Sequence, residues 1–163
     1  MASGDTLLIF TALHNSPPAS NPATFDVRNG TPVLDFDATT QEIAIFLGVL
    51  PRNYAGGGIT VYPHWAATSA TTGTIGWDVS FERIGDSQQD IDSDGFATAQ
   101  TVTATTVPGT SGHVDITNVA VTTGANIDSI AVGEAFRLRV RRDVASDDAA
   151  GDAELLAVEM KET

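Results

Sequence analysis

Cysteine is absent from the 163 residues of the sequence. This absence excludes disulfide bonds, zinc sites with thiolate ligands and catalysis by a cysteine nucleophile. By itself it does not indicate a cellular compartment. If the protein works outside a cell, a well-packed core, a bound metal or the association of subunits must stabilise it instead.

Positive charge is scarce, because 8 Lys and Arg residues stand against 21 Asp and Glu residues, for a formal net charge of −13. A surface of this sign repels the phosphates of nucleic acids and anionic membranes. No apolar run approaches the roughly 20 residues that a membrane helix needs. The N-terminal residues also lack the basic segment of a secretory signal. We therefore expect no nucleic acid and no membrane as partners.

Motifs of catalytic chemistry are missing as well. The sequence has no G-x-S-x-G, no H-E-x-x-H and no phosphate-binding loop. His14, His64 and His113 do not have the spacing of metal ligands. Two of the acidic residues could still meet in the fold as a glycosidase pair, but no pattern singles out such a pair. We therefore predict no catalytic residues and no enzyme, with a hydrolase as the minor alternative.

Short runs of β type dominate what the sequence does contain. In the clearest run, Ile75, Trp77, Val79 and Phe81 alternate with polar or small residues, which is typical of a strand with one buried face. No stretch has a helical stripe over three turns. The runs that we expect to be strands are residues 6–12, 23–28, 32–37, 43–50, 59–68, 75–82, 97–107, 113–122, 134–143 and 153–161.

Strands without crossover helices between them pair in antiparallel fashion. The pattern therefore predicts an all-β, single-domain antiparallel β-sandwich, jelly-roll-like, with about eight to ten strands. We expect residues 1–22 to form an N-terminal arm or first strand with a proline-rich spacer, and residues 23–163 to form the sandwich domain. Within it, Asn29-Gly30 predicts a short hairpin.

Two runs, residues 7–10 and 43–50, are apolar on both faces. Either another part of the same chain covers the second face, or that face is an interface between subunits. A cysteine-free β-protein with two such runs is a candidate for a symmetric homo-oligomer. The interface residues that we predict for this case are Leu7, Leu8, Ile9, Phe10, Phe46 and Tyr62.

A possible metal site is the D-x-D-x-D-G pattern formed by Asp90, Asp92 and Asp94. Alternate carboxylates of this kind can converge on calcium. A complete EF-hand loop needs Glu at its twelfth position, where this sequence has Thr101, and no flanking helices are expected. We therefore predict no cofactor except a possible Ca²⁺ at the three aspartates, with a plain solvated turn as the alternative.

Three arginines, Arg137, Arg139 and Arg141, are expected on one face of a strand. They could bind an anion, but in so acidic a chain we favour pairing with carboxylates of neighbouring strands. The carboxylates that we expect as partners are Glu82, Glu154 and Glu159.

Aromatic residues could form a platform on which a sugar stacks. Trp65 and Trp77 are in phase with apolar rows, so we predict that both are buried. Tyr54 lies in a glycine-rich loop, and we predict that it is the better exposed ring. With the acidic loop at 86–94, Tyr54 supports the hypothesis of a glycan-binding module, whose other ligand-binding residues are unknown.

Several segments resemble phage-encoded virion proteins, a group of β-sandwich (jelly-roll) proteins that includes capsid decoration (cement) proteins and tail-fibre modules. The segments are residues 49–54, 56–61, 64–69, 77–81, 139–142, 147–148 and 151–156. The resemblance covers residues 25–163, and its motifs are structural rather than catalytic. It implies a jelly-roll that is commonly trimeric and exposed on a virus particle.

Two roles compete within that group. The chain starts with Met and has no fibre shaft, which favours a decoration protein. Such a protein would be made in the host cytoplasm, form a homotrimer, and bind the major capsid protein on the capsid surface of the virion. The alternative is a tail-fibre or receptor- and carbohydrate-binding module.

Overall fold

The computed structural model describes residues 4–87 and 89–163. Within them the strands are β1 (Thr6–Thr11), β2 (Thr24–Arg28), β3 (Thr31–Phe36), β4 (Ile43–Val49), β5 (Ile59–Ala67), β6 (Thr74–Ile84), β7 (Gln100–Thr106), β8 (Asp115–Ile116), β9 (Val119–Val121), β10 (Ala135–Arg142) and β11 (Ala153–Glu162). Two short 3-10 helices are η1 (Ala12–His14) and η2 (Ala125–Ile127). No helix in the described ranges is long and apolar enough to cross a membrane.

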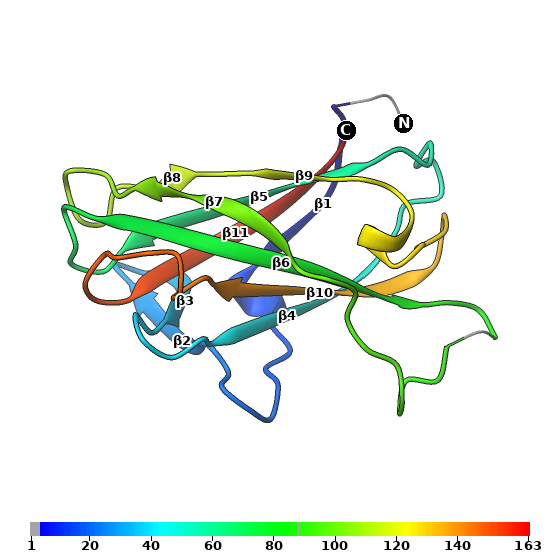
Figure 1. The fold of residues 1–163 in the computed structure, drawn as a ribbon, viewed down its shortest axis with the longest axis horizontal. Helices are drawn as coiled ribbons and strands as arrows, with labels where there is room; N and C mark the ends of the chain where they lie inside the picture. Colours follow the sequence, from blue (N-terminus) through cyan, green and yellow to red (C-terminus); the bar gives the residue numbers. More distant parts are fainter. Residues whose placement is uncertain (1–3, 88) are drawn as a thin grey trace.

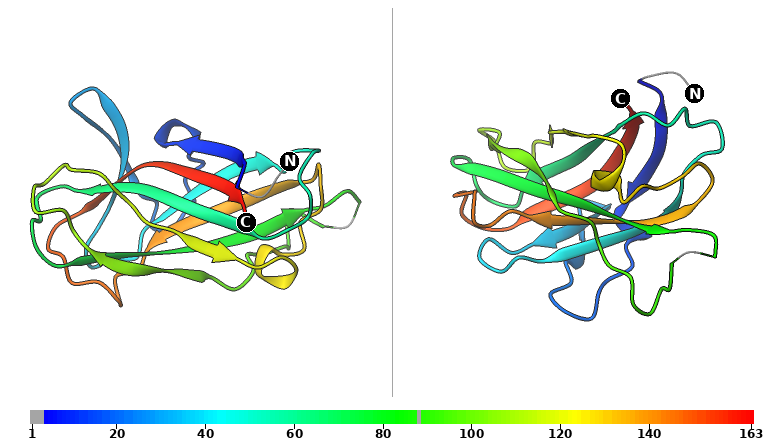
Figure 2. Two further views of the ribbon diagram at one scale, coloured as in Figure 1. Left: turned by 90° about the horizontal axis from the view of Figure 1, so that it is seen from above. Right: turned by 45° about the vertical axis from the view of Figure 1, so that its right-hand side comes forward.

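The strands form the two layers of a sandwich (Figures 1 and 2). Sheet A has the order β2-β3-β11-β5-β8, with β1 also paired to β11 and β9 to β5. Sheet B has the order β4-β10-β6-β7. The strand pairings of the described chain are antiparallel. The predicted antiparallel β-sandwich is therefore confirmed.

Side chains from both sheets meet between the layers. Trp65 of β5 and Trp77 of β6 are completely buried, and their ring centroids are 6.4 Å apart. Trp77 also packs edge-on against Phe36 of β3 at 5.0 Å. Large aromatic side chains dominate the energetics of such a core. The prediction that both Trp residues are buried is confirmed.

The N-terminal run packs on its own sandwich. Phe10 of β1 stacks on Phe46 of β4 with ring centroids 5.3 Å apart, and Leu7 is buried in the same core. These three side chains are core residues of one chain, which corrects their expected place between subunits. The reason is that β1 pairs with β11 and lies against the Phe46 side of β4, whereas Leu47 and Val49 on the other side of β4 are 58% and 55% exposed.

The remaining interface residues lie differently. Ile9 of β1 points outward and is 60% exposed, whereas Leu8 is partly buried against the core. Tyr62 of β5 is partly buried, and the ammonium group of Lys161 lies 5.5 Å from its ring centroid. An interface role for these three residues stays a prediction.

A tight hairpin joins β2 to β3. Arg28 and Thr31 face each other across it, and Asn29 and Gly30 have φ angles of +48° and +81°. Gly and Asn adopt such angles with the least strain, so this dipeptide turns the chain within two residues. The turn places Arg28 at the tip of β2, where its side chain can reach the neighbouring strands.

Candidate functional site

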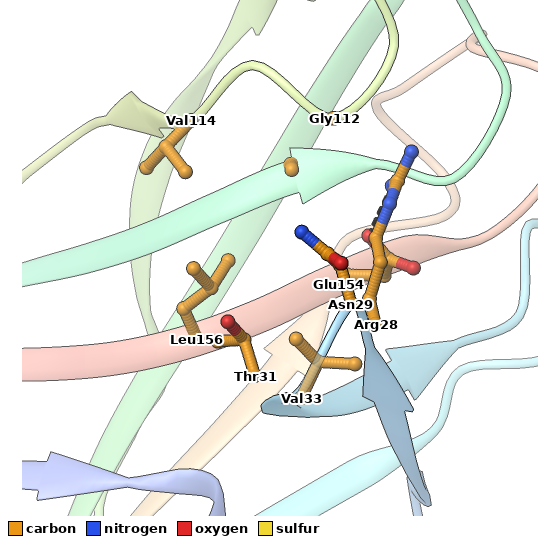
Figure 3. Close-up of a pocket in the computed structure, with 9 residues that line it drawn as sticks. Arg28, Asn29, Thr31, Val33, Gly112, Val114, Glu154 and Leu156 are labelled. Carbon is orange, nitrogen blue, oxygen red and sulfur yellow. Dashed lines mark hydrogen bonds and ion pairs between the residues drawn. The ribbon is translucent and has the colours of Figure 1, made fainter.

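A groove of about 300 Å³ lies on the outer face of sheet A. The β2–β3 hairpin forms one wall, and the loop that leads from β7 into β8 forms the other (Figure 3). The lining residues are Arg28, Asn29, Thr31, Val33, Ala66, Gly112, Val114, Glu154 and Leu156. They come from distant parts of the sequence, so the site exists only in the folded chain.

The floor of the groove follows from the alternation of β5 and β11. Ala66 and Glu154 form a cross-strand pair that faces outward, because their neighbours Trp65 and Leu155 point into the core. Ala66 has a small side chain, which leaves depth above the sheet. The register of β11 shifts after Leu155. A shift of this kind re-aims a side chain, and the next residue, Leu156, lines the groove.

Arg28 is the cation of the groove. Its Nη1 donates to a Glu154 carboxylate oxygen at 2.5 Å and to the carbonyl oxygen of Ala67 at 3.1 Å. Its Nη2 donates to the carbonyl oxygen of Thr68 at 3.4 Å. The Arg28 side chain is 36% exposed, whereas that of Glu154 is 6% exposed. The guanidinium is therefore held in one orientation and still reaches the solvent.

Gly112, in the loop between β7 and β8, lies close to this guanidinium. Its backbone N–H donates to the carbonyl oxygen of Ala67 at 3.1 Å, which ties the β7–β8 loop to the end of β5. Gly112 has a φ of +80°, and a Cβ atom there would lie 2.7 Å from Nη2 of Arg28. A larger residue would strain the backbone and collide with the arginine, so glycine permits the close approach.

Carboxylates gather on the hairpin side of the groove. Asp35 is the cross-strand partner of Glu154, and Asp26 is the cross-strand partner of Val33, so these side chains share the outer face. Burial, and then the charges of Glu154 and Asp26, raise the pKa of Asp35 from 3.8 to about 6. Within the described ranges, one carboxylate oxygen of Asp35 is buried without a hydrogen-bond partner. This wall is therefore crowded with negative charge.

The groove offers several hydrogen-bonding groups to a ligand. A guanidinium has five N–H donors, so the three bonds of Arg28 within the described chain leave two donors unused. The side chains of Asn29 and Thr31 also have no hydrogen-bond partner in the part of the chain that the structure describes. Leu156 and Val114, of which Val114 is 47% exposed, supply an apolar surface, whereas Val33 is buried. Such a mixture suits a small neutral ligand with many hydroxyl groups.

The aspartates of the predicted calcium loop are exposed. The carboxylate of Asp90 accepts a hydrogen bond from the backbone N–H of Asp92 at 3.0 Å, and its carbonyl accepts one from Asp94 at 2.9 Å. In residues 4–87 and 89–163, no three His, Asp or Glu side chains are grouped so that they could hold a metal ion. Calcium binding at Asp90, Asp92 and Asp94 stays a prediction.

The predicted exposure of Tyr54 is wrong. Its side chain is 5% exposed, and its hydroxyl donates to the carbonyl oxygen of Gly57. The loop folds back on the sandwich because a buried carboxylate, that of Glu162, accepts the backbone N–H of Ala55 at 2.9 Å. Tyr54 therefore cannot serve as a stacking platform.

Two of the three arginines of β10 pair with carboxylates across sheet B, as expected, and the third bonds to a hydroxyl group. Arg137 forms an ion pair with Glu82, Arg141 forms one with Asp78 at 2.8 Å, and Arg139 donates to a hydroxyl, that of Ser80, at 2.9 Å. Glu82 is thus confirmed as a partner. The expectation that Glu154 and Glu159 are partners of these arginines is wrong, because both lie on β11 in the opposite sheet. Glu154 accepts a hydrogen bond from Arg28, and Glu159 accepts one from the hydroxyl of Thr6.

The sequence did not point to the groove. Most of its residues belong to strands whose order and register cannot be deduced from periodicity, and apart from Asn29 of the Asn-Gly turn none of them stands in a motif that indicates a function. The usable signal was indirect. Asn29-Gly30 predicted the hairpin, and with it the position of an arginine at a strand end.

No family model matches the chain, and no curated protein matches its sequence. Solved structures do share its fold. A CBM35 module from Cellvibrio japonicus Abf62 matches with a TM-score of 0.53 at 10% identity, over 96% of this chain and 94% of that one. The C-terminal CBM6 of LamC, a marine laminarinase from Zobellia galactanivorans, matches with a TM-score of 0.50 at 11% identity, over 97% and 100%.

A third structure contains the CBM22-1 and GH10 modules of xylanase 10B from Clostridium thermocellum, in complex with xylohexaose. It matches with a TM-score of 0.52 at 13% identity, over 100% of this chain and 29% of that longer one. Identities this low establish a shared fold and no more. The chain is a jelly-roll β-sandwich of the type seen in these carbohydrate-binding modules.

Proposed function

We propose that this protein is a non-catalytic carbohydrate-binding module whose ligand lies in the groove on sheet A. The observation that carries the proposal is the groove itself, where the exposed donors of Arg28, Asn29 and Thr31 stand beside the apolar side chains of Leu156 and Val114. Sugars offer the matching surface, with hydroxyl groups at their edges and apolar C–H groups on their faces. The fold that the chain shares with carbohydrate-binding modules supports this function by analogy.

Preorganisation supports the proposal. Arg28 is held by Glu154 and by two carbonyl groups, so little side-chain entropy is lost when a ligand binds. The nine lining residues include no aromatic ring. Hydrogen bonds and contacts with the apolar side chains of Leu156 and Val114 would therefore supply the affinity, in place of ring stacking.

The test is a glycan array with the purified chain, followed by calorimetry on each glycan that binds. Thr31→Trp should fill the groove and weaken binding by at least about tenfold, because the indole would occupy the ligand's volume. Thr103→Trp is the matched control, since Thr103 is an exposed threonine of β7 in the other sheet. Unchanged binding in Thr31→Trp, with circular dichroism showing a native fold, would refute the site.

A second candidate function is that of a viral structural protein. A different surface of the molecule supports it. On the outer face of sheet B, Leu47 and Val49 of β4 are 58% and 55% exposed. Exposed apolar neighbours of this kind often mark contacts with other proteins. In this proposal the chain forms a homotrimer on the capsid surface and binds the major capsid protein. Light scattering tests it: a trimer that Leu47→Asp dissociates would support it, and a monomer at high concentration would contradict it.

A further inference from the structure

We propose that the groove selects uncharged glycans and rejects acidic ones, such as chains of uronic acids. The inference rests on the proposed function, because it names the class of sugar that the same groove accepts. It starts from how the one cation among the lining residues, Arg28, is used.

The positive charge of Arg28 is already compensated inside the protein. Glu154 lies 2.5 Å from Nη1 and is almost completely buried, so the two charges form a closed pair at the groove wall. The other bonds of the guanidinium go to the carbonyl oxygens of Ala67 and Thr68, which carry partial negative charge. A ligand therefore meets hydrogen-bond donors that belong to a neutral pair, not a free cation.

Two further carboxylates have no cation of their own among the residues that line the groove. Asp35 is the cross-strand neighbour of Glu154 and Asp26 that of Val33, so both lie next to lining residues on the same outer face, although neither lines the groove itself. An acidic sugar would bring a third negative charge to this wall without a partner to neutralise it. Its carboxylate would also lose water on entering the groove, which costs more than it does for a hydroxyl group. The net charge of −13 adds repulsion at longer range.

The outcome for neutral sugars is different. A neutral sugar brings no charge to this wall, and its hydroxyl groups can accept hydrogen bonds from the two donors that Arg28 leaves unused within the described chain. The donors of Asn29 and Thr31 complete this set. The wall thus discriminates by charge while keeping affinity for polyhydroxy ligands, which is specificity by repulsion.

The experiment compares matched glycans on the intact chain. Neutral gluco-, xylo-, manno- and galacto-oligosaccharides are set beside oligogalacturonate, and beside oligogalacturonate methyl ester, which has the same backbone without the charge. We expect acidic glycans to bind at least about tenfold more weakly than neutral ones, and the difference to shrink as salt is raised.

The double variant Asp26→Asn, Asp35→Asn removes both unpaired charges, and should strengthen binding of oligogalacturonate several-fold. Asp86→Asn is the matched control, because this exposed residue lies in the loop after β6, at the opposite end of the molecule from the hairpin groove (Figure 1). It removes one charge, so it is compared with the single variants Asp26→Asn and Asp35→Asn as well as with the double variant, and it should leave the acidic glycan rejected.

The possible results are distinct. Rejection of oligogalacturonate that the double variant relieves and Asp86→Asn does not relieve would support the inference. Equal binding of neutral and acidic glycans to the native chain would overturn it and leave the carbohydrate-binding function standing. Absence of binding to every glycan would overturn the proposed function, and this inference with it.

Discussion

Arg142 and Arg28 both tie a connecting loop to the sandwich, but their surroundings differ. Arg142, the last residue of β10, is completely buried. Its Nε and Nη2 donate to the two carboxylate oxygens of Asp147 at 2.7 and 3.1 Å. Its remaining bonds reach the carbonyl oxygens of Phe36, Gly151 and Ala149. All of its donors are used, and none is left for a ligand.

Arg28 has the same kinds of partner, one carboxylate and main-chain carbonyls, yet it keeps two donors and a third of its surface open to the solvent. The comparison teaches how a structural arginine differs from one that can bind a ligand. Complete satisfaction and burial indicate a purely structural role. Incomplete satisfaction in a fixed orientation, beside a groove, is what the proposed recognition role of Arg28 requires.

Arg142→Met should have the largest effect. The change leaves the Asp147 carboxylate buried without its partner, together with three carbonyl oxygens. Loss of one partner from a buried ion pair typically costs about 3–5 kcal/mol. The free energy of unfolding measured in urea should fall by this amount. A loss below about 1 kcal/mol would show that the acidic turn opens and rehydrates the carboxylate.

Arg28→Met should cost less in stability and more in function. The arginine is partly exposed, so we expect a loss of about 1–2 kcal/mol, mainly because the Glu154 carboxylate loses its charged hydrogen bond. Binding of a neutral glycan should fall because two donors are removed. Urea titration measures the first quantity and calorimetry the second. If Arg28→Met destabilises the chain as strongly as Arg142→Met, the proposed distinction between the two arginines fails.

Asp35→Asn should produce the smallest effect, and it should stabilise the protein. The folded pKa of about 6 lies above the ordinary value of 3.8, so the folded protein holds this proton more tightly than the unfolded chain does. Stability is therefore lost as pH rises from about 4 to about 6, and the loss is complete above that range. Asparagine avoids this cost.

At about pH 7.5 the Asp35→Asn variant should be more stable than the native chain by about 1 kcal/mol, after allowance for solvent screening. Near pH 3 the native carboxyl is protonated in both states, so the gain should vanish. Urea titrations at the two pH values measure the difference. An equal gain at both would mean that burial of the side chain, rather than its charge, determines the cost.

Much of the fold could be predicted because it depends on neighbouring residues. Period-two alternation placed the strands, and it correctly predicted the burial of Trp65 and Trp77. Asn29-Gly30 predicted the hairpin, because the φ angles of a two-residue turn depend on those two residues alone. Glu82 could also be predicted as the partner of Arg137, because a stripe of like charges on one strand favours opposite charges on the neighbouring strand.

Tertiary structure alone decided the groove, the burial of Tyr54 and the partner of Arg28. The bond from Arg28 to Glu154 joins residues 126 positions apart, and it exists because β3 lies between β2 and β11 in sheet A. Strand order and register depend on the packing of the whole chain. The sequence by itself therefore determined which segments are strands and which of their faces are apolar. Which polar side chains meet on the outer faces depended on how those strands were ordered, because a side chain contacts its neighbours across the sheet rather than along the chain.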